Sequence, residues 1–305
     1  MLRYGLCCIF KEQPITFRQT TAKYLLSLHR REQLEKLSGL CTTNLENLLA
    51  ALKWIVSADI KAFRVLSPLF PRCTHPEVGY VIDDLPGAET ISALAELVQT
   101  YRAAHDIRLS LHPDQFNVLS SPRTEVVDKT VQELEYQGIV AEMTGAEVIN
   151  IHGGGAYGDK EQALTRFAEN FNLLSERVRS RLTVENDDIT YTPADLLPLC
   201  RRIQIPLVYD VHHHRCLSDG MTREEATHEC IASWGVRRQE PYFHISSPKH
   251  GWGAQNPRAH ADYIDPEDFP RIWHELDATV DIEAKAKELA VCRIMKHFRS
   301  IDSAA

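Results

Sequence analysis

Eight short runs of apolar and β-branched residues recur along the chain, and segments with helical spacing lie between them. The runs cover residues 3–9, 61–66, 107–112, 147–152, 182–186, 206–211, 242–246 and 279–284. Near-continuous apolar strands that alternate with helices are typical of a parallel sheet buried on both faces. An open, doubly wound sheet also fits this alternation, but the count of eight favours closure. We therefore predict an α/β protein, a single (β/α)8 TIM barrel spanning residues 1–305.

Helical periodicity marks the segments between these runs. The predicted helices are 44–56, 91–105, 129–143, 160–178, 192–203, 222–234 and 284–298. Thr90 and Thr222 are placed to cap helices, and Pro193 suits a first helical turn. Three stretches rich in Pro, Gly and polar residues are expected to be long loops: 10–20, 67–88 and 247–265.

The composition narrows the class of protein. No apolar run approaches the roughly 20 residues of a membrane-spanning helix, and the first residues lack the apolar segment of a signal peptide. The eight cysteines are scattered without a C-x-x-C pair, so we expect reduced thiols and a cytoplasmic protein. A net charge of −8 argues against nonspecific binding of polyanions, although it is compatible with a local positive groove.

Residues that can bind metal stand at or near the C-terminal ends of six successive predicted strands. They are His112, His152, Glu185, Asp210, His244 and Glu283. In a barrel these ends converge on one mouth, where the active sites of such barrels lie. A single histidine at a strand end is usually a hydrogen-bonded rim residue. Six such groups together would repel one another or remain unsatisfied without cations between them, so the pattern predicts a multi-metal site.

The stretch VYDVHHHR (208–215) places three histidines directly after the sixth predicted strand. A histidine run by itself is compatible with a solvated loop as well as with a metal site. His260 lies in a loop that leaves the seventh predicted strand at the mouth, and its position alone favours neither a ligand nor a surface residue. The three glycines after His152 permit close approach of the backbone to a ligand, which indicates phosphate binding only weakly.

Seven motifs follow one another along the chain: LSLHPDQFNVLSSP, INIHGGG, LTVEND, VYDVHHHR, FHISSP, AHADYI and DIEAKAKELA. Together they resemble the UV damage endonucleases (the UvsE or UVDE family), relatives of endonuclease IV. The resemblance implies a (β/α)8 barrel with a cluster of divalent metals, usually manganese. It also implies a DNA-repair enzyme that nicks double-stranded DNA immediately 5′ to cyclobutane pyrimidine dimers and 6-4 photoproducts, and often at abasic sites. In-line attack would leave a 3′-hydroxyl and a 5′-phosphate.

The resemblance further implies the residues of the site. The ligands of three ions would be His112, His152, Glu185, Asp210, His213, His244, His260 and Glu283. Glu185 would bridge the ion on His112 and His152 to a second ion. Asp210, His244 and Glu283 would share that second ion, and His213 and His260 would hold the third. We expect Glu185, His244 and Glu283 to carry the chemistry and Mn²⁺ to be the metal, although these ligands also accept Zn²⁺, Co²⁺ or Mg²⁺.

Lesion recognition in the family uses a Gln–aromatic pair just after the third strand, and the matching residues here are Gln115 and Phe116. This pair would be wedged into the duplex while the damaged bases, which stack and pair poorly, leave it. A buried loop aromatic is the alternative for Phe116. Lys and Arg residues near the mouth would contact phosphates. Candidates that equally suit solvated surface charges are Arg64, Arg123, Lys249 and Arg258.

The sequence departs from the family pattern at three places. Tyr242 stands where some relatives carry a Lys, described as carboxylated, near the metals. The end of the first strand has Leu6 and Phe10 where relatives place a Tyr and an Asn near the lesion. Ser67-Pro68 replaces the usual Ser-Ser after the second strand.

Two other functions stay open beside the endonuclease. A sugar isomerase or epimerase on the same barrel also uses His, Asp and Glu with a divalent metal, but it typically needs fewer ligands. A non-catalytic lesion-binding protein would be expected to lose some of the candidate ligands, and here the set is intact. We therefore expect the endonuclease, acting as a monomer without membrane association.

Overall fold

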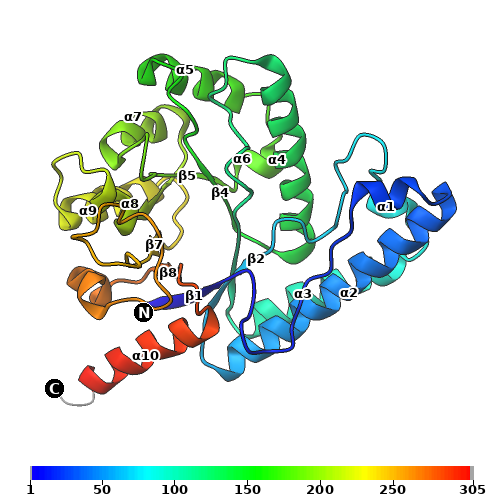
Figure 1. Cartoon of the computed structure of the whole chain (residues 1–305), viewed down its shortest axis with the longest axis horizontal. Coiled ribbons are helices and arrows are strands. Elements are labelled where there is room, and N and C mark those ends of the chain that lie inside the picture. The colour runs from blue at the N-terminus through cyan, green and yellow to red at the C-terminus, as the bar shows by residue number, and fades with distance from the viewer. Residues whose placement is uncertain (1, 303–305) are drawn as a thin grey trace.

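The computed structural model describes residues 2–302 of the chain. Its eight strands are parallel and pair in chain order, and β1 also pairs with β8, so the sheet closes into a barrel (Figure 1). The strands are β1 (Arg3–Cys7), β2 (Ala62–Val65), β3 (Arg108–Leu111), β4 (Val148–His152), β5 (Leu182–Glu185), β6 (Leu207–Asp210), β7 (Tyr242–Ile245) and β8 (Thr279–Ile282). Each lies within one of the predicted runs, and the predicted TIM barrel is confirmed.

The helices surround the barrel, and α2 packs along α3 (Figure 1). The α-helices are α1 (Ala22–Leu26), α2 (Arg30–Ser57), α3 (Ala88–Ala104), α4 (Thr124–Thr144), α5 (Lys160–Phe171), α6 (Glu176–Arg179), α7 (Pro193–Ile203), α8 (Val211–Cys216), α9 (Arg223–Trp234) and α10 (Glu288–Asp302). Three short 3₁₀ helices are η1 (Ile82–Asp84), η2 (Pro266–Asp268) and η3 (Arg271–Glu275). Among the described residues, no helix is long and apolar enough to cross a membrane.

Two of the predicted helix starts are confirmed and one is wrong. Thr222 caps α9, because its side chain accepts a hydrogen bond from the backbone N–H of Glu225. Pro193 occupies the first turn of α7, as predicted. Thr90, however, lies inside α3, which already begins at Ala88 after Gly87.

Two predicted helices differ most from those in the structure. The helix expected over 44–56 begins at Arg30, where the Glu32 carboxylate accepts from the backbone N–H of His29 at 3.0 Å. The helix expected over 160–178 is two helices, α5 and α6. The Glu135 carboxylate of α4 accepts hydrogen bonds from the backbone N–H and the hydroxyl of Ser175, each at 2.7 Å, and so fixes the chain at the start of α6.

The barrel interior is charged near its N-terminal end as well as at its mouth. Arg108, the first residue of β3, is buried, and it donates to Thr279 Oγ1 at 3.1 Å. Its guanidinium also lies 4.9 Å from the centre of the Tyr242 ring. Apolar packing dominates between the barrel and the helices, where Phe243 stacks on Trp273 with ring centroids 4.6 Å apart. The eight cysteines are all free thiols.

Candidate metal centre at the barrel mouth

The C-terminal ends of five neighbouring strands bring the predicted ligands to the mouth of the barrel. His152, Glu185 and Asp210 are the last residues of β4, β5 and β6. His112 directly follows β3, and His244 is the third residue of β7. Because neighbouring strands are parallel, the sheet register pairs His152 with Glu185 and Asp210 with His244. Glu283 joins them from the residue after β8.

The ligand atoms form three groups, each with its atoms within 4.8 Å of one another. The groups are His112–His152–Glu185, Glu185–Asp210–His213 and Glu185–His244–Glu283. Glu185 belongs to all three, as expected for a bridging carboxylate. The grouping differs from the expected partition, in which Asp210 shared an ion with His244 and Glu283.

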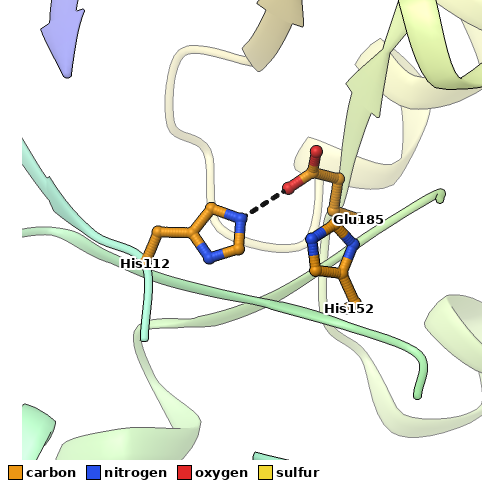
Figure 2. A group of neighbouring side chains, drawn as sticks. All are labelled: His112, His152 and Glu185. Atoms are coloured by element: carbon orange, nitrogen blue, oxygen red, sulfur yellow. Dashed lines mark hydrogen bonds and ion pairs between the residues drawn. The ribbon is translucent and has the colours of Figure 1, made fainter. Parts of the chain in front are cut away.

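The first group lies between β3, β4 and β5, and its side chains converge (Figure 2). His112 Nε2 is 2.9 Å from Glu185 Oε2, and the rings of His112 and His152 have centroids 5.1 Å apart. Asn150 Nδ2 donates to Glu185 Oε2 at 2.5 Å, and Thr183 Oγ1 donates to Asn150 Oδ1 at 2.9 Å. A buried polar chain therefore sets the orientation of the shared carboxylate.

The second group depends on the start of helix α8. Asp210 caps this helix by accepting from the backbone N–H of His213 at 2.8 Å, which turns the imidazole toward the mouth. His213 Nδ1 lies 3.4 Å from Glu185 Oε1 and 3.6 Å from Asp210 Oδ2. Asn186 ties β5 to β6, because its side chain pairs with both the N–H and the C=O of Asp210 at 2.9 Å.

The third group includes a buried arginine. His244 Nδ1 is 3.0 Å from Glu185 Oε1 and 3.4 Å from Glu283 Oε1. Arg64 of β2 donates through Nη1 to Glu283 Oε1 at 2.7 Å, and its Nη2 lies 2.9 Å from His244 Nε2. Arg64 is buried, so the alternative of a solvated surface charge is wrong.

Unpartnered buried atoms test whether these residues fit divalent ions. Four buried ligand atoms have no hydrogen-bond partner within the described residues: His152 Nδ1, Glu185 Oε1, Asp210 Oδ2 and His244 Nδ1. Each such atom costs about 1–3 kcal/mol when it is left unsatisfied. All four belong to the three groups, and a nitrogen and oxygen donor set of this kind suits divalent transition metals. The residues therefore fit the ions.

The charges of the neighbours govern the ionisation of Glu185. Burial alone would raise the pKa of this carboxyl. The imidazoles of His244 and His152, together with the close contacts of His112 and His213, instead hold its pKa well below the usual value. Glu185 is therefore an anion throughout the physiological range, which is the form that binds a cation.

The other histidines of the mouth have different roles. His214 contacts the Tyr209 hydroxyl at 2.9 Å and Asp219 Oδ1 at 2.7 Å, so it stabilises the turn after α8. His212 is buried with both ring nitrogens unpartnered, and its ring centroid lies 5.2 Å from that of His260. His260 itself stands at the edge of the centre, with Nδ1 3.8 Å from Glu283 Oε2. Of the three consecutive histidines, His213 is the one in a ligand group.

Gln115 and Phe116 lie in the loop between β3 and α4, on the same side of the barrel as the ligands. Both side chains are exposed, and Phe116 is 77% exposed. Asp114 Oδ1 accepts from the backbone N–H of Phe116 at 2.7 Å, which gives this loop a fixed turn. The alternative of a buried loop aromatic is therefore wrong.

Tyr242, the departure from the family pattern on β7, belongs to a buried network that sequence reasoning missed. Its hydroxyl is 3.0 Å from both Ser110 Oγ and Asp281 Oδ1. Asp281 Oδ2 in turn accepts from Arg64 Nε at 2.9 Å. Gly5 is required beside this carboxylate, because a Cβ there would lie 2.0 Å from Asp281 Oδ1. Charged residues of opposite sign in the second and eighth predicted strands were the available signal.

The remaining basic residues proposed to contact phosphate differ in whether an acidic side chain lies near them. Arg123 lies 3.6 Å from Glu125, and Arg258 lies 3.7 Å from Asp188. Lys249 is exposed and has no acidic partner within residues 2–302. Of these three, Lys249 is the one with a free charge to offer a phosphate.

Comparisons with known proteins agree with this geometry. The family profile described as UV-endonuclease UvdE matches residues 2–305. A UV DNA damage endonuclease of Bacillus thuringiensis subsp. konkukian (strain 97-27) is 34% identical over 282 residues, which is 90% of this chain and 86% of the relative. One from Bacillus cereus (strain G9842) is 32% identical over 284 residues, with the same coverage.

The solved structures with a similar fold include another UV damage endonuclease. The crystal structure of SacUVDE superposes with a TM-score of 0.86 at 28% identity and covers 99% of both chains. Endonuclease IV from Thermus thermophilus matches with a TM-score of 0.63 at 16% identity, over 99% of this chain and 100% of that one. D-Psicose 3-epimerase from Clostridium cellulolyticum H10 matches with a TM-score of 0.55 at 10% identity, over 99% and 98%. The last two similarities show the fold alone.

These matches decide between the open functions. A profile that covers nearly the whole chain and relatives above 30% identity favour DNA cleavage over sugar isomerisation and over lesion binding without catalysis. This chain therefore belongs to the UvdE family of UV endonucleases, DNA-repair enzymes that cut damaged DNA.

Proposed function

We propose that this enzyme hydrolyses the phosphodiester immediately 5′ to UV photoproducts in double-stranded DNA. The substrates are cyclobutane pyrimidine dimers, 6-4 photoproducts and abasic sites, and the products carry a 3′-hydroxyl and a 5′-phosphate. The observation that carries the proposal is the set of three ligand groups that share Glu185 at the barrel mouth. Such a set suits phosphodiester chemistry, in which charge on both the attacking and the leaving oxygen needs stabilisation.

The centre is proposed to hold three divalent ions, with Mn²⁺ as the metal. His112 and His152 would hold one, His244 and Glu283 a second, and Asp210 and His213 a third, with Glu185 shared and His260 at the edge. When bound, such ions polarise the phosphodiester and lower the pKa of a bound water. Glu185, His244 and Glu283 are the proposed catalytic ligands, because His244 Nδ1 faces Glu185 Oε1 at 3.0 Å and Glu283 Oε1 at 3.4 Å, and both His244 Nδ1 and Glu185 Oε1 lack a hydrogen-bond partner among the described residues.

Lesion recognition is assigned to Gln115 and Phe116. Phe116 is large, apolar and 77% exposed on a loop of the mouth. Contact with a partner such as a DNA base would remove this apolar ring from water, which is favourable. A damaged dinucleotide leaves the stack at lower cost than normal bases do, so insertion of this pair selects for damage. The enzyme is proposed to act as a monomer.

A defined substrate tests this function. A duplex oligonucleotide with one thymine dimer is incubated with the purified enzyme and Mn²⁺. We expect a single nick directly 5′ to the dimer, and no nick in an undamaged duplex, with EDTA, or with Glu185→Gln. An intact dimer duplex in the presence of folded, metal-loaded enzyme would contradict the proposal, and a duplex with an abasic site tests the second substrate class.

A further inference from the structure

The three ligand groups differ in one respect: a positive side chain enters only one of them. Arg64 lies 2.7 Å from Glu283 Oε1 and 2.9 Å from His244 Nε2. Within residues 2–302, neither Glu185 nor Asp210 has a Lys or Arg within 4.0 Å, and their ionic neighbours are histidines. The Glu185–His244–Glu283 group is thus the one that already contains a cation.

This cation is held in place by the barrel itself. Arg64 Nε and Nη2 both lie 2.9 Å from Asp281 Oδ2. The other Asp281 oxygen is 3.0 Å from the Tyr242 hydroxyl and occupies the space that a side chain at position 5 would fill. The Arg64 side chain is 9% exposed and that of Asp281 is 0% exposed. Moving Arg64 out of the centre would leave Asp281 as a buried, unpaired charge, which is strongly unfavourable.

Arg64 occupies a ligand oxygen that an ion at this position needs. A guanidinium has donors only, so its contact with Glu283 Oε1 uses a lone pair of the oxygen that faces His244 Nδ1 at 3.4 Å. An ion placed between these atoms would also lie close to a fixed positive charge in a buried site, where repulsion is poorly screened. Both effects weaken binding at this position.

The histidine of this group also lacks the support that metal-binding histidines usually have. Such a ring normally donates its second N–H to a carboxylate, a carbonyl or water. His112 has this support, because its Nε2 faces Glu185 while its Nδ1 lies 3.1 Å from Pro113 O. The second nitrogen of His244 instead faces Arg64, and the carboxylate of Asp281 is 3.8 Å away.

We propose that Arg64 makes the Glu185–His244–Glu283 position the weakest and most readily exchanged of the three ion positions. The other two positions keep their ions at concentrations of free metal at which this one empties. Occupancy of the Glu185–His244–Glu283 position would then follow the free metal concentration around the enzyme. The inference rests on the divalent metal centre of the proposed function, and it concerns the order of binding rather than the reaction.

Metal titration of the full-length chain tests this order. Metal-free protein is dialysed against buffered free Mn²⁺, and bound manganese per chain is measured by mass spectrometry. The wild type should fill in two phases, with the last ion requiring about tenfold or more higher free Mn²⁺. Arg64→Met, which removes the charge at similar size, should bring the last ion to the affinity of the others, whereas Arg64→Lys should keep two phases.

Arg108→Met is the matched control, since it removes a buried barrel arginine at the N-terminal end of β3, away from the mouth. It should leave both phases unchanged. Two ligand variants identify the weak ion even where Arg64→Met does not fold: Glu283→Gln should abolish the weak phase, and His112→Asn should abolish part of the tight phase. Weaker binding of the last ion in folded Arg64→Met would overturn the proposal. So would a single phase in the wild type, or a weak phase lost in His112→Asn.

The nicking assay separates this inference from the proposed function. Two-phase metal binding without cleavage would contradict the proposed function and leave the proposed order of metal binding intact. Cleavage with single-phase metal binding would contradict the order of binding alone. A wild type that binds no divalent metal would overturn both.

Discussion

A single amide controls the residue on which all three ligand groups depend. Asn150 Nδ2 donates to Glu185 Oε2 at 2.5 Å within the buried barrel. We expect Asn150→Ala to weaken Mn²⁺ binding by about 10–100-fold, the usual effect of removing a partner of a metal ligand. Equilibrium dialysis measures the change. Asn172→Ala, at the exposed end of α5, is the control and should bind as the wild type does. Unchanged binding in Asn150→Ala would show that Glu185 needs no such support.

Phe116 gives a second prediction for a single side chain. Because the ring is 77% exposed, Phe116→Ala should change the free energy of unfolding by less than about 0.5 kcal/mol. Stacking of a base on an aromatic ring contributes about 1–3 kcal/mol, so binding of a dimer-containing duplex should fall by about 5- to 150-fold. Leu97→Ala, a 53% exposed residue of α3, should alter neither quantity. A stable variant with normal affinity for damaged DNA would exclude Phe116 from recognition.

Single residues were predictable from sequence where one strand determines their position. His112, His152 and Glu185 follow directly from the ends of their own strands, and the structure brings them together. The position of His260 could not be predicted from the sequence, since it depends on how a long loop returns to the mouth. Its Nδ1 lies 3.8 Å from Glu283 Oε2, and no spacing in the sequence reports this distance.

At the scale of elements, β1 must pass close to β8, and Gly5 permits it. A Cβ at this position would lie 2.0 Å from Asp281 Oδ1, inside a barrel that cannot open without losing strand pairing. Gly5→Ala should therefore destabilise the protein by about 1–3 kcal/mol, as overpacking in cores does. Urea denaturation measures the change.

Gly39 provides the matched control for this prediction. It lies inside α2, where an added Cβ would have no neighbouring atom within 4 Å, and helix interiors prefer Ala to Gly. Gly39→Ala should stabilise the protein by roughly 0.5–1 kcal/mol. Equal effects of the two substitutions would contradict the packing argument at Gly5.

The elements themselves were predictable to different degrees. Each strand falls within its predicted run because burial on both faces makes the run apolar throughout. Helix α8 was not predicted, since six residues carry too little periodicity to be recognised. Its formation depends on Asp210, whose side chain accepts from the His213 N–H at 2.8 Å. This cap is also what moves His213, rather than His212 or His214, into a ligand group.

At the scale of the whole molecule, closure of the barrel creates contacts that no local pattern contains. Strands β2 and β8 both pair with β1, so Arg64 meets Asp281 across 217 residues of sequence. The sequence showed two charged residues in apolar strands but not that they face each other. The electrostatic environment of the third ligand group therefore follows from the topology and could not be predicted before it was known.

The protonation of the centre links metal binding to pH. Burial alone would lower the pKa of His213, but the carboxylates of Asp210 and Glu185 outweigh it and hold this pKa well above its usual value. Metal binding requires the neutral ring, so it must displace a proton. The stabilisation that protonated His213 gives the metal-free fold is complete below about pH 6.5 and is lost as pH rises through the raised pKa.

Manganese affinity should therefore rise with pH and level off only above the ordinary pKa range of histidine. Below that plateau, each proton displaced costs up to about tenfold in affinity per pH unit. Titrations between about pH 6 and about pH 8.5 measure the rise, and calorimetry in buffers of different ionisation enthalpy counts the protons released. Asp210→Asn removes the main charge that raises the His213 pKa, so its weaker binding should level off at lower pH. An affinity that is flat over this range, with no proton released, would contradict a protonated His213 in the metal-free centre.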